Sequence, residues 1–359
     1  MKKIISVILA AAATLALATG CNNTNVTIPS VPSVTVPSEI ESLVSEGKEL
    51  VDDLNIAIPT KDRAGNDIKV PEKVEKIVSM APSTTQVLID LGLADKIIAV
   101  DSYSAAYADK LNKGIPTDLD MMNPDNEAIA ALAPDIVFTS GMSSVGGTSP
   151  FQSLVDSGIC VADIPSPSSL EGICEDIEFI GACVGKGVEA LAYSKGFTAY
   201  IAGVEEIGKS IPADQQKTVL VMMNVPSAEY PTIYTFGKGT YMNEMLEAIG
   251  AKNAFGDKEG WLSISVEEAI AANPDIILMD CNWMPDAADQ VKALKGWENV
   301  TAIKDGAVYA VNEDLCSRPN HHVSEAILEW AKLIYAEKYS NFTKSFDDIT
   351  NEILSKILG

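Results

Sequence analysis

Residues 127–138 read EAIAALAPDIVF, and residues 267–278 read EEAIAANPDIIL. In both stretches a glutamate opens an alanine-rich run, and a Pro-Asp-Ile triplet begins seven residues later. An alanine-rich run is typical of a helix, and a short run of branched apolar residues after a proline is typical of a buried strand. The chain therefore carries the same helix-to-strand unit twice, 140 residues apart. This repetition predicts two related α/β lobes.

Short apolar runs alternate with helical patterns on both sides of each unit. Runs rich in Ile and Val are typical of parallel strands that are buried on both faces. Strands are expected at residues 76–81, 97–101, 136–139, 160–164, 218–222, 276–279 and 308–311. Helices are expected at residues 84–91, 127–132, 150–157, 241–249, 323–338 and 346–358. This alternation predicts mostly parallel sheets.

A longer helical stretch, residues 170–208, separates the two groups of strands, and glycines near 181–187 predict a break within it. We therefore expect an N-terminal α/β lobe over residues 59–182, a bridging helix over 183–210 and a C-terminal α/β lobe over 211–359. The predicted fold class is α/β, with two Rossmann-like lobes joined by a single long backbone helix.

The first twenty residues have the features of an export signal. Lys2 and Lys3 precede an apolar run, residues 4–17, that is shorter than the roughly 20 residues a membrane-spanning helix needs. Small residues then precede Cys21, and this junction resembles the cleavage box of bacterial lipoproteins, in which the cysteine carries the lipid. An ordinary secretory signal with an incidental cysteine is the alternative. Residues 21–58, rich in Asn, Thr, Pro and Ser, are expected to form a flexible tether behind the anchor.

The charge and the cysteines exclude some classes of protein. The formal net charge is −24, and such a surface repels phosphate backbones, so no nucleic-acid partner is expected. Five cysteines follow Cys21, and none stands in a C-x-x-C pair, so no metal site is expected from them. Their spacing is typical of small buried hydrophobes rather than of a disulfide framework.

The first turn of each repeated helix carries an exposed carboxylate. Ser265 and Glu268 form a capping-box pattern, which places Glu267 at the second helical position. Asp125 stands at the matching cap of the first copy and gives Glu127 the same place. Taken singly, each glutamate is explained by the helix dipole, which favours carboxylates at helix starts by about 0.3–1 kcal/mol. The matched pair favours a shared function.

Two stretches carry a resemblance to a known family. Residues 70–104, VPEKVEKIVSMAPSTTQVLIDLGLADKIIAVDSYS, followed by NEAIAALAPDIVF, resemble the solute-binding proteins of bacterial ABC importers for ferric siderophores, haem and vitamin B12. The likeness runs from about residue 62 to the C-terminus. It implies two α/β lobes bridged by one rigid helix, a ligand in the cleft between them, and little hinge motion. It also implies a glutamate at each lobe tip that docks on permease arginines; by motif position these are Glu127 and Glu267, although the letters EAIAA recur from Glu268.

The resemblance further implies an extracytoplasmic protein, held by its lipid anchor alone at the outer face of the bacterial cell membrane. Its partners would be an ABC permease with its ATPase, and it would act as a monomer without a cofactor or resident metal of its own. Its ligand would be a metal chelate: a ferric siderophore or haem, or a cobalamin-like corrinoid.

Ligand contacts are expected in loops that follow the strand ends, as in open α/β sheets generally. This rule and the chemistry of the second lobe nominate Pro82, Ser83, Tyr103, Met142, Asn224, Trp283, Arg318, His321 and His322. An imidazole there could reach a haem iron or a corrinoid cobalt, and Arg318 could pair with a ligand carboxylate. Solvent-facing or core positions are the plain alternatives for these residues.

Other functions fit the same residues less well. Residues 203–210, GVEEIGKS, match the phosphate-loop pattern, but that motif needs a preceding strand, and here a helix precedes it. No hydrolase or zinc-protease motif is present, so the chain is not expected to be an enzyme. A surface ligand sensor and a redox enzyme with the same bilobal fold remain as alternatives. Loss of Glu127 and Glu267 should abolish transport but not ligand binding, a split that neither alternative predicts.

Overall fold

The structure is a computed structural model, and it describes residues 56–142 and 149–358. These residues all lie within the unit Val34–Gly359. The expected export signal, Cys21 and the tether up to residue 55 lie outside the described residues. None of the described helices combines the length and the apolar character needed to cross a bilayer.

The first lobe is built on a four-stranded parallel sheet with the strand order β2-β1-β3-β4. Its strands are β1 (Ile77–Ser79), β2 (Ile97–Val100), β3 (Ile136–Thr139) and β4 (Cys160–Asp163). The helical segments between them are α3 (Pro82–Asp90), η1 (Ala94–Lys96), η2 (Ser102–Tyr107), α4 (Asn126–Ala131) and α5 (Gln152–Asp156). The four expected strands of this half are therefore present, each shortened by at most a few residues.

The second lobe repeats this topology. Its parallel sheet has the order β10-β9-β5-β7. Starting from the β7 edge, these are the second, first, third and fourth parallel strands of this lobe in chain order. The first lobe has the same succession. The strands are β5 (Thr218–Met222), β7 (Lys252–Asn253), β9 (Ile276–Met279) and β10 (Val308–Ala310). The helices are α8 (Tyr241–Ala248), α9 (Val266–Ala272), α10 (Ala287–Lys292), α11 (Thr301–Lys304), α12 (Glu313–Cys316), α13 (Val323–Ile334) and α14 (Ala336–Tyr339). The prediction of two related α/β lobes is confirmed.

The sequence repeat forms the same turn in both lobes. Ala133 and Asn273, which precede the two prolines, have φ values of 50° and 44°, and they are the non-glycine residues with positive φ in the described chain. The next residue but one is an aspartate in each case. Asp135 Oδ2 accepts two backbone N–H bonds just ahead of β1, and Asp275 Oδ2 accepts the first N–H of β5. The Pro-Asp pair therefore clamps the third strand of each sheet to the first.

A small antiparallel pair of strands was not predicted. Strands β6 (Thr232–Phe236) and β8 (Trp261–Ser265) pair antiparallel, with Thr232 opposite Ser265. Ser265 ends β8 and caps α9 in the predicted capping box with Glu268, and Asp125 caps α4 as expected.

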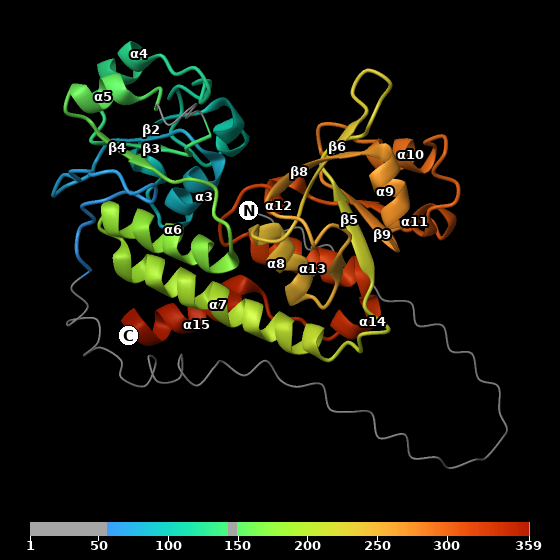
Figure 1. The fold of residues 1–359 in the computed structure, drawn as a ribbon. Coiled ribbons are helices and arrows are strands. Elements are labelled where there is room, and N and C mark those ends of the chain that lie inside the picture. Colours follow the sequence, from blue (N-terminus) through green and yellow to red (C-terminus); the bar gives the residue numbers. More distant parts are fainter. Residues whose placement is uncertain (1–55, 143–148, 359) are drawn as a thin grey trace, which may run out of the picture. The chain divides into compact units, whose positions relative to one another are not determined.

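Two helices lie between the lobes along the chain, and the longer one is the predicted bridging helix. α6 (Leu170–Cys183) and α7 (Gly187–Lys209) are separated by three residues around Gly185, whose φ of +72° suits glycine. Figure 1 shows α7 passing beneath both sheets with α15 (Phe346–Leu358) alongside it, and α7 also packs against α6, α8 and α13. The predicted break in the long helical stretch is confirmed. The phosphate-loop-like residues 203–210 form the helical end of α7, as their context predicted.

One hydrophobic core runs through both lobes. It joins one face of each sheet through α6, α7, α13 and α15, and includes Ile77 of β1, Phe197 of α7 and Val221 of β5. The opposite faces are covered separately by smaller clusters, one containing Ile129 of α4 and the other containing Trp297. Because this cluster is continuous across both lobes, bending one lobe against the other would disrupt close packing.

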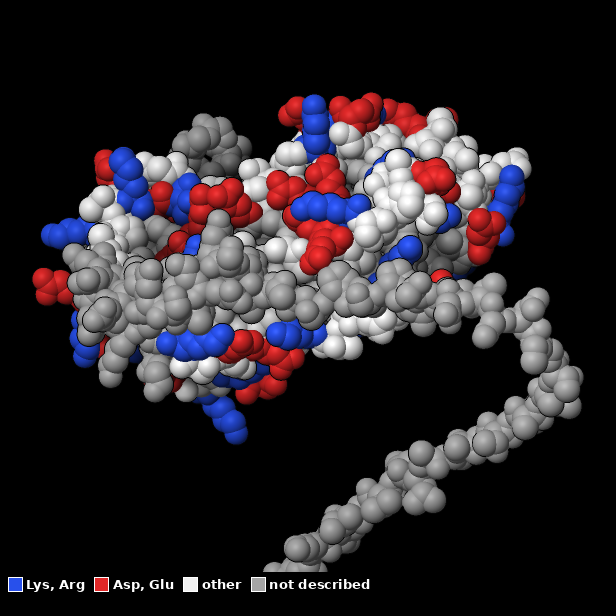
Figure 2. All heavy atoms as spheres, turned by 90° about the horizontal axis from the view of Figure 1, so that it is seen from below, with Lys and Arg blue, Asp and Glu red and all other residues white. Residues whose placement is uncertain are grey.

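The cysteines agree with the expectation from their spacing. Cys160, Cys174, Cys183, Cys281 and Cys316 are buried and unpaired. On the face drawn in Figure 2, acidic side chains are interspersed with lysines and arginines, and this face shows no continuous basic patch.

Candidate functional site

A cleft of about 380 Å³ lies between the two lobes and is the main candidate for a ligand site. Its wall from the first lobe comes from the first turns of α3 after β1, from η2 and the loop after it, from the loops that follow β3 and β4, and from one side of α6. Its wall from the second lobe comes from α12 and the loop behind it, which follow β10. The lining residues are Ala81, Pro82, Ser83, Thr84, Val87, Tyr103, Met121, Met122, Ser140, Met142, Ile164, Pro165, Ser166, Pro167, Asp176, Ile177, Ile180, Glu313, Asp314, Ser317, Arg318 and Pro319. The site therefore gathers at the carboxyl ends of parallel strands, where such folds bind ligands.

A buried network of hydroxyl groups holds the loops on the first-lobe side. The Thr85 hydroxyl donates to Ser79 Oγ (2.8 Å) and lies 2.9 Å from Ser104 Oγ. Ser104 in turn donates to Asp101, whose other carboxylate oxygen accepts the backbone N–H of Tyr103 (2.8 Å). Burial raises the pKa of Asp101 although these hydrogen bonds oppose the shift. The network fixes the ends of β1 and β2, and with them the segment that presents Tyr103 to the cleft.

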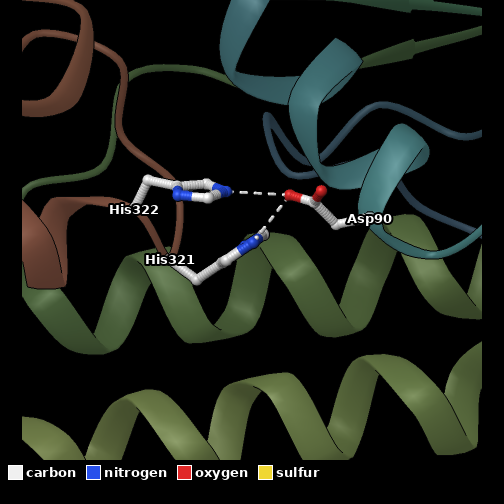
Figure 3. A group of neighbouring side chains, drawn as sticks. All are labelled: Asp90, His321 and His322. Carbon is white, nitrogen blue, oxygen red and sulfur yellow. Dashed lines mark hydrogen bonds and ion pairs between the residues drawn. The ribbon is translucent and has the colours of Figure 1, made fainter. Parts of the chain in front are cut away.

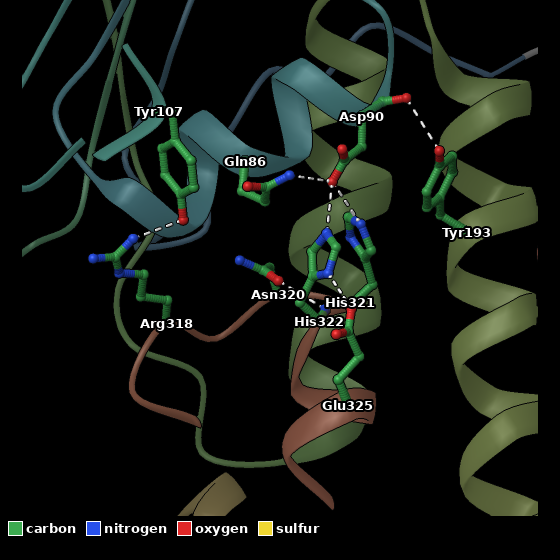
Figure 4. Close-up of polar contacts among 9 residues, drawn as sticks. All are labelled: Gln86, Asp90, Tyr107, Tyr193, Arg318, Asn320, His321, His322 and Glu325. Atoms are coloured by element: carbon green, nitrogen blue, oxygen red, sulfur yellow. Dashed lines mark hydrogen bonds and ion pairs between the residues drawn. The ribbon is translucent and has the colours of Figure 1, made fainter. Parts of the chain in front are cut away.

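The arginine of the cleft is already occupied by neighbours. An Arg318 guanidinium nitrogen lies 2.5 Å from Asp314 Oδ1, and another donates to the Tyr107 hydroxyl (2.8 Å) on the opposite lobe (Figure 4). The guanidinium carbon also lies 5.4 Å from the centre of the Tyr107 ring, within reach of a cation–π contact. Asp176 on the cleft wall is paired with Arg63, with 2.6 Å between Nε and Oδ1. Among the described lining residues, no cation is left without a carboxylate partner.

Beside the cleft, two histidines of the second lobe meet one carboxylate of the first. Nε2 of His321 and Nε2 of His322 each lie 2.9 Å from Asp90 Oδ2 (Figure 3). Gln86 donates to the same oxygen (2.7 Å), and Tyr193 donates to the backbone carbonyl of Asp90 (3.1 Å). Asp90 ends α3, and the histidines immediately precede α13, so this group ties the two lobes together.

The three ionisable groups of this contact influence one another. Burial lowers the pKa of His321, whose side chain is 1% exposed, more than Asp90 raises it. Burial also acts against a charged His322, but the hydrogen bonds to Asp90 and Glu325 outweigh it and raise its pKa to about 9. Burial acts to raise the pKa of Asp90, yet the hydrogen bonds from both histidines outweigh it and hold that pKa well below its usual value. The contact is therefore an ion pair of Asp90 with His322, beside a neutral His321.

The structure brings five of the nine nominated ligand residues to the cleft: Pro82, Ser83, Tyr103, Met142 and Arg318. Tyr103 and Met142 are 62% and 66% exposed, as expected of side chains on an open ligand site. The other four do not line it.

Each of those four has a different setting. Asn224 donates to the backbone carbonyl of Thr232 (2.9 Å) and accepts from the N–H of Tyr234 (2.8 Å), so it anchors β6 instead of facing the cleft. Trp283 is 64% exposed and outside the cleft. His321 and His322 are held by Asp90, which explains why neither imidazole reaches the cleft wall.

Sequence reasoning missed several lining residues. The segment Ile164 to Pro167 follows β4, and the rule that nominated the loops after β1 to β3 should have included it. Met121 and Met122 come from a loop without regular structure. The apolar side of α6 could not have been assigned to the cleft without knowing how that helix packs.

The two helix-start glutamates differ from their neighbour Glu268. Glu127 and Glu267 are exposed at the second position of α4 and α9. Glu268 accepts the Ser265 N–H (2.9 Å) and the Lys258 ammonium (2.7 Å), and the Lys258 bond, followed by the bonds from Ser265, lowers its pKa to about 2. Its carboxylate is engaged, whereas no side-chain bond of Glu267 to another described residue is present. This geometry favours Glu267 as the counterpart of Glu127.

Comparison with known proteins identifies the family to which this fold belongs. A model of the family described as periplasmic binding protein matches residues 77–315, about two thirds of the chain. The chain belongs to the periplasmic binding protein family. The uncharacterized ABC transporter substrate-binding lipoprotein YvrC of Bacillus subtilis is 31% identical over 278 residues, covering 77% of this chain and 85% of that protein.

Two proteins that this chain resembles differ in what they bind. The vitamin B12-binding protein of Vibrio parahaemolyticus is 26% identical over 270 residues, covering 72% of this chain and 88% of that protein. The solved structure of the Haemophilus influenzae protein MolA bound to molybdate has a TM-score of 0.67 at 20% identity, covering 83% of this chain and 96% of that one. This periplasmic binding protein is thus an ABC transporter substrate-binding protein of the siderophore, haem and B12 type, and its homologues are transport proteins. Membership does not select the ligand.

Proposed function

We propose that this protein is a lipoprotein, held by Cys21 at the outer face of the cell membrane, that delivers a bulky metal chelate as a monomer to an ABC permease and its ATPase. The observation that carries the proposal is the cleft between the lobes, which both lobes line and which is largely apolar. An apolar cleft with few polar groups suits a large organic ligand better than a small hydrated ion.

The charges of the cleft support a chelate that is neutral or positively charged. Asp176, Glu313 and Asp314 line the cleft, and its arginine, Arg318, is already paired with Asp314. A desolvated anion needs cationic or N–H partners, and binding one here would require breaking an existing ion pair. This favours a ferric siderophore of the hydroxamate type, or a corrinoid, over haem with its propionates and over an oxyanion such as molybdate.

The position of the histidines also favours a siderophore or a corrinoid over haem. Both imidazoles of the chain lie at Asp90 and not on the cleft wall, so an imidazole axial ligand to a haem iron has no source there. A ferric hydroxamate brings a complete oxygen ligand set to its metal and needs only an apolar and hydrogen-bonding surround.

Absorbance titration of the purified protein tests the ligand class. Cyanocobalamin, a ferric hydroxamate and haemin are added separately, and molybdate binding is followed by calorimetry. Saturable binding of the hydroxamate or the corrinoid is expected, and Tyr103→Ala should weaken it because this exposed ring lines the cleft. Saturable binding of molybdate or haemin alone would refute the charge argument.

Docking to the permease is tested separately with isosteric changes. Glu127→Gln and Glu267→Gln remove the charge but keep the shape, and the double variant should lose uptake in cells while its affinity for the chelate stays unchanged. Glu268→Gln is the matched control on the same helix: it should disturb the start of α9 but leave uptake nearly normal. Normal uptake with the double variant would favour a sensor instead of a transporter. Metabolic labelling with palmitate, lost in Cys21→Ala, tests the lipid anchor.

A further inference from the structure

The two histidines of the chain converge with Asp90 on one point, although Asp90 precedes them by 231 and 232 residues. One nitrogen from each imidazole and one carboxylate oxygen lie within 4.8 Å of one another, close enough to be ligands of one metal ion. This arrangement could not be predicted from the sequence, because two adjacent histidines without a third ligand do not indicate a metal site. We propose that Asp90, His321 and His322 form a Zn²⁺ site that fastens the two lobes together beside the cleft.

The donor atoms suit this metal. Zn²⁺ binds imidazole nitrogen and carboxylate oxygen at about 2.0–2.2 Å, which places donor atoms of a tetrahedral site roughly 3.3 Å apart. Both nitrogens now lie 2.9 Å from Asp90 Oδ2, so each has to move outward by only about 0.4 Å to admit the ion. Three protein donors leave a fourth position for water, and the His322 side chain, 26% exposed, marks the open side.

The surroundings of His322 orient its ring so that Nε2 points at the Asp90 carboxylate. Its Nδ1 lies 2.7 Å from Glu325 Oε1, so the ring donates its Nδ1 proton to that carboxylate. A carboxylate behind a histidine is the arrangement that orients metal-bound imidazoles and makes their other nitrogen a better donor. Nε2 then faces Asp90 Oδ2, and two acceptors at 2.9 Å need a positive centre between them. Zn²⁺ can supply that centre.

His321 is fixed more firmly than His322. Its ring stacks on Phe346 with 5.1 Å between centroids and meets the edge of Tyr193 at 4.9 Å. Coordination through Nε2 moves its proton to Nδ1, which is buried without a hydrogen-bond partner among the described residues. That unpaired proton weakens the site compared with one in which each imidazole has a carboxylate behind it.

A metal ion at this site would link the two lobes directly. Asp90 is the last residue of α3 in the first lobe, and His322 caps the start of α13 in the second. A metal ion there adds a bond between the lobes on the side of the cleft, in addition to α7. It does not depend on the identity of the chelate, and it lies outside the cleft lining.

Calorimetric titration of the full chain with Zn²⁺, after removal of metals with EDTA, tests the proposal. One equivalent is expected to bind saturably and to raise the thermal midpoint. His322→Ala should abolish this binding, and Glu325→Gln should weaken it by about 10–100-fold, the usual effect of removing a carboxylate behind a metal-bound histidine. Glu329→Gln, one turn further along α13, is the matched control and should bind Zn²⁺ as the unaltered chain does.

Thermal melts of each variant in EDTA show whether it folds, and Asp90→Asn replaces His322→Ala if that variant does not. Co²⁺ provides a second readout, because its visible absorption should indicate tetrahedral nitrogen and oxygen ligation and should disappear on addition of Zn²⁺. The proposal is overturned if the unaltered chain binds no single saturating equivalent. It is equally overturned if His322→Ala binds Zn²⁺ with unchanged affinity, since the metal would then lie elsewhere on the acidic surface. Chelate binding is titrated separately in the presence of EDTA. Failure of the Zn²⁺ site and failure of the proposed chelate binding can therefore be told apart.

Discussion

Replacing Gly208 by alanine tests whether α7 is locked to the second lobe. Helix propensity alone predicts that a Gly→Ala change within a helix stabilises the protein by up to about 1 kcal/mol. The structure predicts the opposite sign. A Cβ at this position would lie 2.8 Å from the nitrogen of Gly250 and 2.9 Å from the carbonyl carbon of Ile249, and closer still to the carbonyl oxygen of Ala248.

These neighbours are backbone atoms, so no side-chain rotation can relieve the overlap. Forcing extra volume into such a contact costs typically about 1–3 kcal/mol, which exceeds the gain in propensity. Three backbone atoms under 3.0 Å place the cost in the upper half of that range, so we expect a net loss of about 1–2 kcal/mol, or a thermal midpoint lowered by about 2–8 °C. Urea denaturation followed by circular dichroism measures the change.

The control is Ala202→Gly, an exposed position on the same helix. It should cost about 1 kcal/mol through propensity alone, so both variants are expected to destabilise although they exchange the same two residues in opposite directions. If Gly208→Ala stabilised the protein by as much as Ala202→Gly destabilised it, α7 would not be in close contact with the second lobe, and the stiffness inferred for the connection would fail.

Three further changes have signs that the structure determines. Ala133→Asn should stabilise the protein by about 0.5–1 kcal/mol in urea denaturation, because asparagine tolerates positive φ better than alanine and Asn273 holds the equivalent position; a loss of stability would contradict the matched turns. Burial raises the pKa of Asp280 to about 6, so its contribution to stability is full below its unfolded pKa of about 3.9 and is lost as the pH rises through 6. Asp280→Asn should therefore flatten the fall in denaturation midpoint between pH 4 and 7, and an unchanged profile would count against this assignment. Glu244→Gln should cost about 0.5–1 kcal/mol, because the Glu244 carboxylate accepts the first N–H of α6 at Leu170 (2.7 Å) and crosses between the lobes; thermal melts equal to the unaltered chain would show that this contact adds nothing.

Local sequence patterns were enough for most of the regular structure. The bounds of β3, β5 and β9 agree with those expected, since buried parallel strands are continuous apolar runs. The β6–β8 pair was missed because its strands pair across a separation of more than 20 residues, without the two-residue turn that marks a tight hairpin.

The residues of the candidate site were likewise predictable only in part. Loops after strands could be nominated because parallel strands end at one edge of a sheet, and Pro82, Ser83, Tyr103 and Met142 do reach the cleft. Asn224 follows the same rule but is held by β6, a strand that had not been predicted.

By itself, the sequence determined that the protein has two related α/β lobes with a capped, glutamate-bearing helix before the third strand of each, because periodicity, capping and turn chemistry act between near neighbours in the chain. Only the tertiary structure decided that His321 and His322 meet Asp90, and that Arg318 is neutralised before any ligand arrives. Those contacts depend on how α3, α12 and α13 pack around the shared core, and the charge of a site is set by groups that are distant in sequence and close in space.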